Sequence, residues 1–274
     1  MTTTTIDPAT DDGLAPAAST PRPFGVVRHS LALAWRSILK IRRTPEQLFD
    51  VTLQPIVFLL LFVYLFGGAI TGSQHDYLEY VLPGLMVQNA LFSTVAIGVN
   101  LNVDVTKGVF DRFRSLPISR SAPLVGAVLG EVVRYSVSVV VLLVTAFVMG
   151  FRTGTDPLSV LAGCLLVVAF SLCICWAPVL IGLRAREPGA VQGFAFLVMF
   201  PLTFGSSTFV RPETMPSWLQ TWVHVNPVTH LVEAVRGLLL GGPVAGPLAW
   251  TVFWAAVLLA VLGPLAVRAY RLRS

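Results

Sequence analysis

The sequence predicts an all-α integral membrane protein, and its composition and its long apolar runs both indicate this class. Of the 274 residues, 55% are hydrophobic and only 12% are charged, whereas soluble domains carry about 25% charged residues. The mean hydropathy is +0.76. A run of about 20 apolar residues is long enough to cross a bilayer core of roughly 30 Å. Six such runs occur, at about 50–70, 80–102, 125–150, 158–183, 190–210 and 248–268.

The basic residues predict how these six segments are oriented. With a cytoplasmic N-terminus, 16 of the 19 Lys and Arg residues fall on the cytoplasmic side, and only Arg152, Arg211 and Arg236 fall outside. Cytoplasmic loops of membrane proteins carry an excess of such residues. We therefore expect a multi-pass protein of the cell (plasma) membrane with both termini in the cytoplasm. The basic residues of the cytoplasmic loops then account for the net charge of +5, so no nucleic acid partner is expected.

The segments before the first apolar run predict a tail and an interfacial helix. Residues 1–22 are rich in Thr, Ala, Pro and Asp and lack the basic start and apolar stretch of a signal peptide, so we expect a disordered cytoplasmic tail. Over 23–43, apolar and basic residues separate onto two helical faces, which is typical of a helix on the inner membrane surface. A simple basic anchor is the alternative. The transmembrane domain is then 44–274, with Thr44 as N-cap and Pro45 as first residue of its first helix.

A short charged stretch, TKGVFDRFRSLPISR at 106–120, separates the second and third runs. As a helix over 106–116 it has an apolar face and a charged face, and Pro117 ends it. A loop that only fixes the orientation of the spans needs positive charge but no apolar face. The apolar face therefore favours a cytoplasmic coupling helix that docks a partner. A basic loop and packing on the membrane surface are the alternatives. The expected coupling residues are Lys107, Val109, Phe110, Asp111, Arg112, Phe113, Arg114, Leu116 and Pro117.

The sequence contains no motif of an energy-converting enzyme. GK(S/T) is absent, which excludes a P-loop ATPase in this chain, and HExxH and GxSxG are absent too. No Asp, Glu, Lys or Arg lies in the middle of a run, which argues against a carrier that relies on buried charge. Glu131 and Arg134, three apart, are expected to form a local ion pair. The three cysteines lie in one apolar run, which indicates buried thiols and no metal site. Together with the absent motifs, this leads us to expect no catalytic residue and no cofactor in this chain.

Phenylalanines at a spacing of four form stripes in the first and fifth runs. Such stripes predict an aromatic, apolar pathway at a subunit interface, suited to a hydrophobic planar substrate. Ordinary core or lipid-facing phenylalanines are the alternative. Together with polar residues in the middle of the runs, the candidates for the substrate pathway or dimer interface are Phe58, Phe62, Phe66, Gln88, Asn89, Gln192, Phe196, Phe200 and Phe204.

Residues 211–247 are predicted to form short helices at the outer surface. Residues 217–222, SWLQTW, are amphipathic, and their tryptophans suit the membrane interface. Asn226 and Pro227 are the N-cap and first residue of a second helix that ends at Gly241. This helix is too short and too charged to span, so it is expected to lie on the outer surface or to be re-entrant. One side of it carries His230, Glu233 and Arg236.

Taken in order, these stretches resemble the permease subunits of ABC-2 type exporters, specifically the daunorubicin/doxorubicin-resistance permeases of actinobacteria. The resemblance implies six spans, pairing with a second copy of this chain and with two copies of a separate ABC ATPase, which would bind ATP and Mg²⁺. It implies that 106–117 faces that ATPase and that spans one and five meet across the dimer. The matching stretches are PEQLFDV (45–51), YLFGGAI (64–70), TKGVFDRFRSLPISRSAP (106–123), LTFGSSTFV (202–210), MPSWLQ (215–220) and NPVTHLVEAVRGLLLGG (226–242).

The function expected from the resemblance is the membrane subunit of an ATP-driven exporter. Its substrate would be a hydrophobic compound such as a drug or antibiotic, and the chain itself would not be an enzyme. One alternative is a related permease that exports or flips a lipid or glycan precursor. Another is a membrane anchor or sensor that recruits a cytoplasmic protein, although this does not explain the aromatic and polar residues along the spans.

Overall fold

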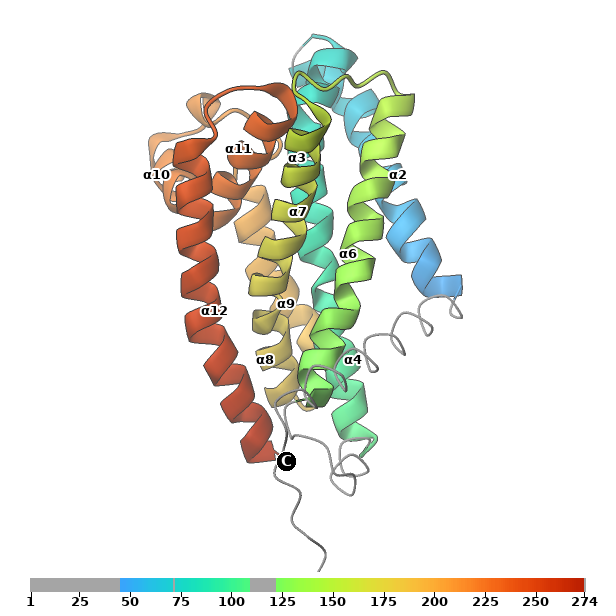
Figure 1. Cartoon of the computed structure of the whole chain (residues 1–274), viewed down its shortest axis with the longest axis vertical. Coiled ribbons are helices and arrows are strands. Elements are labelled where there is room, and N and C mark those ends of the chain that lie inside the picture. The colour runs from blue at the N-terminus through green and yellow to red at the C-terminus, as the bar shows by residue number, and fades with distance from the viewer. Residues whose placement is uncertain (1–44, 71, 109–121, 274) are drawn as a thin grey trace, which may run out of the picture.

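The computed structural model describes residues 45–70, 72–108 and 122–273, and within these ranges all regular structure is helical (Figure 1). The all-α class is therefore confirmed for this part of the chain. The expected tail at 1–22 and interfacial helix at 23–43 lie outside the described residues. The helices are α2 (Pro45–Ile70), α3 (Gln74–Ser93), α4 (Val95–Thr106), α6 (Ala122–Val148), α7 (Pro157–Ile174), α8 (Trp176–Arg184), α9 (Pro188–Phe204), the 3-10 turn η1 (Pro212–Thr214), α10 (Ser217–Val225), α11 (Pro227–Leu240) and α12 (Ala245–Arg273).

Five helical stretches in the described residues are long and apolar enough to cross a membrane, judged by length and composition. They are α2, α3 with α4, α6, α7 with α8, and α12. At the fifth expected span, 190–210, the structure has the shorter α9, which has 17 residues and ends at Phe204. Gly205 follows the last residue of α9 and lies close to the Trp222 side chain of α10, since a Cβ on Gly205 would lie 2.6 Å from Trp222 Nε1.

Two of the long stretches contain a break that the sequence did not predict. The expected single helices at 80–102 and 158–183 are divided at Thr94 and Cys175. At the first break the Leu91 carbonyl accepts two hydrogen bonds from Thr94, one from its main-chain N–H at 3.0 Å and one from its hydroxyl at 2.6 Å. Because both breaks keep right-handed helical angles, the helical direction continues through them with only a local change.

Beyond these breaks, α4 and α8 approach each other backbone to backbone. A Cβ on Gly98 or on Gly182 would lie less than 3 Å from main-chain atoms of the facing helix. The fully buried side-chain amide of Asn102 donates to the carbonyls of Gly182 and Ala185, both at 2.9 Å. These contacts fix α4, α8 and the turn that leads into α9 as one unit.

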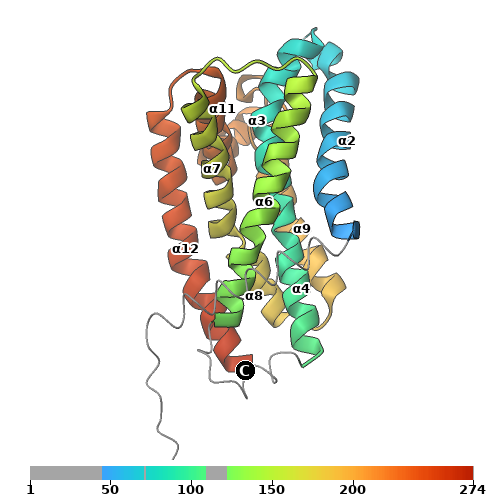
Figure 2. The ribbon, with the colours of Figure 1, turned by 45° about the vertical axis from the view of Figure 1, so that its right-hand side comes forward.

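The two ends of the helix bundle differ in their elements and in their charge (Figures 1 and 2). α4, α8 and α12 all end on the side where the C-terminus lies, whereas α10 and α11 lie at the opposite end. Lys107, Arg184 and the basic residues near the end of α12 belong to the first side, which we call the basic end. The three arginines that the charge count placed outside belong to the other side, which we call the α11 end. Within the described residues, the charge asymmetry therefore follows the long axis of the bundle.

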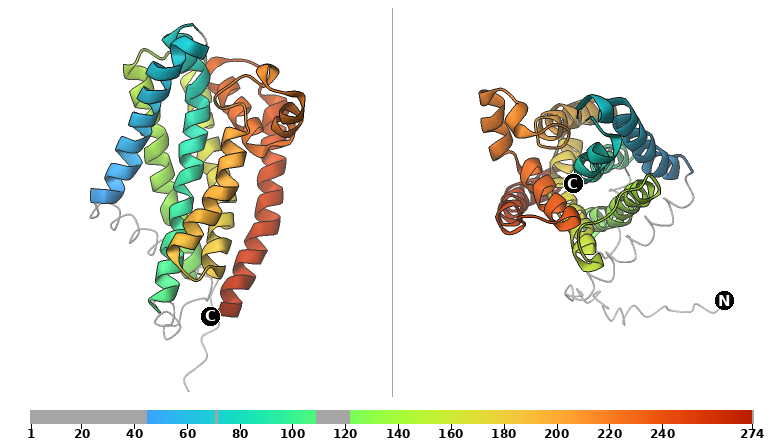
Figure 3. Two further views of the ribbon diagram at one scale, coloured as in Figure 1. Left: turned by 180° about the vertical axis from the view of Figure 1, so that it is seen from behind. Right: turned by 90° about the horizontal axis from the view of Figure 1, so that it is seen from above.

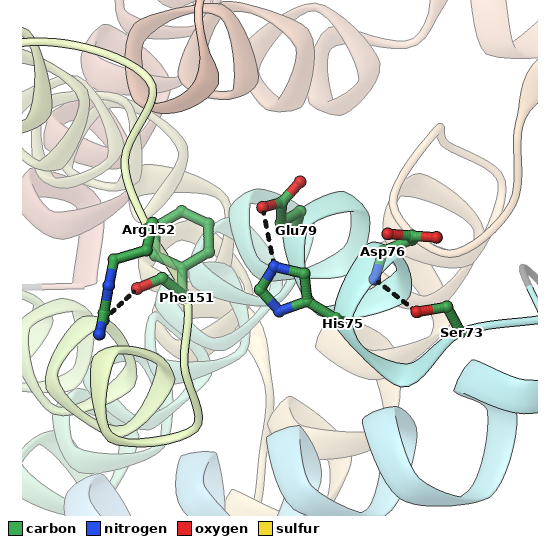
Figure 4. A network of polar contacts seen from close by, with 6 residues as sticks. All are labelled: Ser73, His75, Asp76, Glu79, Phe151 and Arg152. Carbon is green, nitrogen blue, oxygen red and sulfur yellow. Dashed lines mark hydrogen bonds and ion pairs between the residues drawn. The ribbon is translucent and has the colours of Figure 1, made fainter.

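α3 lies at the centre of the bundle and is buried along most of its length. It packs against α2, α6, α7 and α11, which surround it in the view from above (Figure 3, right). Its first turn is capped by Ser73, whose hydroxyl accepts from the Asp76 amide at 3.4 Å (Figure 4). The burial of α3 matters for the site because its second half carries Gln88 and Asn89.

Asn226 begins α11, as predicted, and also joins that helix to α9. Its side-chain oxygen accepts from the Val228 amide at 2.9 Å, and its side-chain amide donates to the carbonyls of Leu202 and Gly205, both at 2.7 Å. The residue is only 2% exposed. One buried side chain therefore satisfies main-chain groups at the end of one helix and the start of the next. At the other end of α11, Gly241 follows Leu240 with a φ of 88°, as expected for a terminating glycine.

Replacing Asn226 with alanine should lower the free energy of unfolding by about 2–4 kcal/mol, because it removes an N-cap and leaves buried carbonyls without a donor. Asn226→Asp keeps the acceptor for Val228 but cannot donate to Leu202 and Gly205 while it is ionised. We therefore expect Asp to retain the cap but not the link to α9. The check is thermal unfolding in detergent; equal Tm values for the wild type and Asn226→Ala would contradict this role.

Candidate functional site

A cavity of about 510 Å³ lies between α2, α3, α4, α6 and α9. Seen from behind, α2 and α9 stand on opposite sides of α3 and α4 (Figure 3, left). We call this space the aromatic cavity, because five phenylalanine rings line it. Its volume lies within the roughly 300–1,000 Å³ of small-molecule sites. The five rings are those of Phe58, Phe92, Phe196, Phe200 and Phe204.

Seven of the nine candidate pathway residues line this one cavity. α2 contributes one of them, α3 contributes the two amides, and α9 contributes the other four. Phe62 and Phe66 of α2 do not line the cavity. Their role in a pathway, and that of the other seven, stays a prediction. The seven are Phe58, Gln88, Asn89, Gln192, Phe196, Phe200 and Phe204.

The two phenylalanine stripes are linked within a single chain. The Phe62 ring stacks on Phe209 with centroids 4.7 Å apart, and Phe209 stacks on Phe204 at 5.0 Å. Phe66 joins the same series through Phe62 at 5.4 Å. The resemblance implied a meeting of these two spans between two copies. The rings of Phe209 and Phe204 already connect α2 to α9 inside one copy, and contact between copies stays a prediction.

The polar groups on the cavity wall differ in how they are satisfied. The Asn89 amide donates to the Leu85 carbonyl at 3.0 Å, and the Ser93 hydroxyl donates to the Asn89 carbonyl at 2.8 Å. Gln88 is 4% exposed, and no donor among the described residues reaches its Oε1. A buried acceptor without a donor lowers the free energy of unfolding by about 1–3 kcal/mol. Gln88 therefore has spare hydrogen-bonding capacity at an otherwise largely apolar wall.

An ion pair lies on the α6 side of the cavity. Arg134 Nη1 is 3.8 Å from Glu131 Oε2, and both side chains are buried. This contact confirms the ion pair that was predicted because Glu131 and Arg134 lie three residues apart in the sequence. The structure adds that Arg134 lines the aromatic cavity, which spacing alone did not indicate.

Two aromatic residues of this region were missed in the sequence. Phe92 contacts Phe196 and Phe200 with centroids 5.4 and 5.7 Å apart. It lies four residues after Gln88, so helical periodicity already placed it on the same face and was a usable signal. Phe209 follows the end of α9, where helical periodicity no longer applies, and only the fold brings it to Phe62.

Most of the expected coupling helix lies outside the described residues, including everything from Val109 to Pro117. The described part corrects its start. Thr106 is the last residue of α4, and Lys107 and Gly108 form a turn in which Gly108 has a φ of 65°. A positive φ interrupts a right-handed helix, so a coupling helix cannot begin at Thr106 as predicted.

Packed apolar helices around an aromatic cavity define a multi-pass membrane protein with room for a small molecule. The chain belongs to the ABC-2 type transporter family, whose profile matches residues 28–240. It is 39% identical over 255 residues, covering 93% of this chain and 90% of the relative, to the daunorubicin resistance ABC transporter permease protein DrrB1 of Streptomyces coeruleorubidus. The family predicted from the quoted stretches is thus confirmed.

More distant relatives belong to the same class. The probable doxorubicin resistance ABC transporter permease protein DrrC of Mycobacterium tuberculosis is 27% identical over 215 residues, covering 78% of each chain. The putative transport permease ycf38 of Cyanophora paradoxa is 24% identical over 225 residues, covering 81% of this chain and 77% of the relative. These relatives are named as permeases, which agrees with the lack of GK(S/T) in this sequence.

Proposed function

We propose that this chain is the membrane half of an ATP-driven exporter that moves a hydrophobic compound out of the cell. The observation that carries the proposal is the aromatic cavity, which occurs in a chain of the ABC-2 type family. The working unit would contain two copies of this chain and two copies of a separate cytoplasmic ABC ATPase. ATP and Mg²⁺ would bind to that partner.

In this proposal α9 is the fifth of six spans, although it has only 17 residues. At 1.5 Å per residue it extends about 25 Å, and the residues after it add further depth. The basic end faces the cytoplasm and the α11 end faces outward, in accordance with the excess of basic residues in cytoplasmic loops. α10 and α11 then lie at the outer surface.

The lining of the cavity supports a planar, apolar substrate with a few polar atoms. Phenylalanine faces stack on flat ring systems, and Phe200 and Phe204 already stack on each other with an interplanar angle of 8°. Gln88 would hydrogen-bond to one polar atom of the substrate. Daunorubicin and doxorubicin appear in the names of the relatives and contain a flat ring system that could stack on these phenylalanines, and we propose compounds with such a ring system as substrates.

The energy would reach the chain through the segment that follows α4. An ATPase bound to the segment 106–117 would move α4 directly when it changes shape. The contact of α4 with α8 would transmit this movement to α9, which forms one wall of the aromatic cavity. The tight approach of Gly98 and Gly182 supports this route, because a backbone-to-backbone contact leaves little room for independent motion.

Phe113→Asp is expected to abolish co-purification of the ATPase subunit, because a carboxylate in the apolar face of the segment would have to be desolvated on docking. The measurement is the amount of ATPase retained by an affinity tag on this chain after co-expression. Phe113→Leu is the matched control and should retain the ATPase, since it keeps the apolar face. Retention of the ATPase by Phe113→Asp at the wild-type level would rule out docking through this face.

A further inference from the structure

A second pocket of about 500 Å³ lies at the α11 end and is polar. Its walls come from α3, the segment after α9, η1, α10 and α11, and it shares no residue with the aromatic cavity. We call it the outer pocket. Of the side chains expected together on one side of α11, His230 is not part of it and stacks on Trp250 instead, at 5.5 Å. The lining of the outer pocket includes one aromatic ring, two arginines and two carboxylates, those of Tyr80, Arg211, Arg236, Glu213 and Glu233.

The base of the outer pocket is a fixed scaffold around Tyr80. The Arg236 guanidinium lies 4.2 Å from the centre of the Tyr80 ring and donates from Nη2 to the carbonyls of Tyr80 and Ser207, at 3.2 and 3.0 Å. The Tyr80 hydroxyl donates to the same Ser207 carbonyl at 3.0 Å. The Arg211 guanidinium lies 5.9 Å from the same ring centre. Two cations from distant parts of the chain thus converge on one aromatic ring.

Only three basic residues fall outside in the charge count, and two of them meet in this pocket. Burial lowers the pKa of Arg236, because the guanidinium loses hydration that hydrogen bonds to carbonyls replace only in part. A buried cation of this kind gains from an anionic partner.

The carboxylates of the pocket do not supply that partner at close range. Glu213 and Glu233 line the same space, yet in the described part of the chain neither arginine has a carboxylate within 4.0 Å. The pocket therefore holds two guanidinium groups and two carboxylates without a close ion pair between them, although the Glu233 carboxylate acts on Arg236 over a longer distance. A ligand with a single charge would meet two groups of its own sign, whereas a ligand with both charges can match all four.

We propose that the outer pocket binds a zwitterionic group, with an oxyanion held by Arg211 and Arg236 and an ammonium held by Glu213 and Glu233. A phospholipid headgroup with a phosphate and a primary amine has this chemistry, and so does a free zwitterion of the same type. Lipid headgroups would lie close to the pocket, because the neighbouring α10 exposes Trp218 and Trp222, and exposed tryptophans are typical of the membrane interface.

The test is thermal unfolding of the purified protein in detergent with three probes. They are phosphatidylethanolamine in mixed micelles, phosphatidylglycerol as an anionic lipid without an amine, and soluble phosphoethanolamine. At saturation, the matching zwitterion should raise the Tm by about 5 °C. Arg211→Gln and Glu213→Gln should each lose this shift, and both positions are exposed, so the fold should tolerate the change.

Arg152→Gln is the matched control for these variants. Arg152 is the third arginine of the α11 end, and its guanidinium donates to the Phe151 carbonyl at 3.0 Å, away from the outer pocket (Figure 4). This variant should show the full Tm shift with the zwitterion. A shift with the lipid alone identifies a headgroup that needs its acyl chains, and a shift with phosphoethanolamine identifies a free zwitterion; both support the proposal.

Three results would overturn the proposal that the outer pocket binds a zwitterionic group. One is the absence of any Tm shift in the wild-type protein, and another is an equal shift with phosphatidylglycerol that Glu213→Gln leaves unchanged, which would mean a simple anion site. The third is a loss of the shift in Arg152→Gln as large as in Arg211→Gln. None of these outcomes depends on transport, so they leave the proposed export function untouched.

Discussion

Gly182→Ala is expected to destabilise the protein by about 3 kcal/mol, although alanine is the better helix former. The added Cβ would lie less than 3 Å from the main chain of Gly98, and a main-chain atom cannot move aside as the end of a flexible side chain can. Inserting atoms into a packed interior typically costs about 1–3 kcal/mol, and occasionally more. Separating α4 from α8 would also stretch the hydrogen bond from Asn102 to the Gly182 carbonyl.

The matched control for this change is Gly193→Ala in α9, a position that no proline follows. There a new Cβ would meet no atom of the described residues within 4 Å, its own helix and its chain neighbours apart. Since alanine is favoured over glycine inside a helix by about 1 kcal/mol, this variant should be as stable as the wild type or slightly more stable. Thermal unfolding and the yield of monodisperse protein are the measurements. Equal behaviour of the two variants would show that α4 and α8 do not approach as described.

Phe200→Ala is expected to change which compounds are exported without loss of assembly. Phe200 lies at the centre of the aromatic contacts of α9, touching Phe92, Phe196 and Phe204. Losing one stacking surface should weaken apparent affinity for flat compounds by about 1–2 kcal/mol, or roughly 5- to 30-fold. Flexible apolar compounds that do not stack should be affected less.

Leu197→Ala is the control for this prediction, because Leu197 belongs to the same helix, is 69% exposed and does not line the cavity. Its efflux profile should match that of the wild type. The measurement is efflux of a panel of planar and non-planar compounds from cells with equal amounts of each variant. A profile of Phe200→Ala that matches Leu197→Ala for every compound would count against the aromatic cavity as the substrate pathway.

The sequence predicted best those features that depend on local chemistry. Asn226 and Pro227 mark the start of α11, and Gly241 marks its end, because an N-cap and a left-handed terminating residue act within one helical turn. The spacing of Glu131 and Arg134 likewise predicted their ion pair. The two phenylalanine stripes were visible for the same reason, since a spacing of four keeps side chains on one side of a helix.

Features that depend on contacts between distant segments could not be read from the sequence. The break at Thr94 has no proline or glycine within three residues. The break at Cys175 did have a local signal that was overlooked, because Pro178 lacks the N–H that would bond to the Ile174 carbonyl. The approach of Gly98 to Gly182 and the meeting of Arg211 with Arg236 each require the assembled bundle. α9 was predicted too long because the run at 190–210 was judged by its overall hydropathy, although Gly205, Ser206 and Ser207 directly after Phe204 are typical of a helix end.

Uptake into inside-out membrane vesicles would show whether this chain, together with a separate ATPase, exports a hydrophobic compound. Vesicles that contain this chain and its ABC ATPase are supplied with a fluorescent planar compound and with ATP or a non-hydrolysable analogue. We expect accumulation with ATP, none with the analogue, and none when the chain carries Phe113→Asp. Accumulation that is the same with and without ATP, or the same in vesicles that lack this chain, would contradict export by this chain.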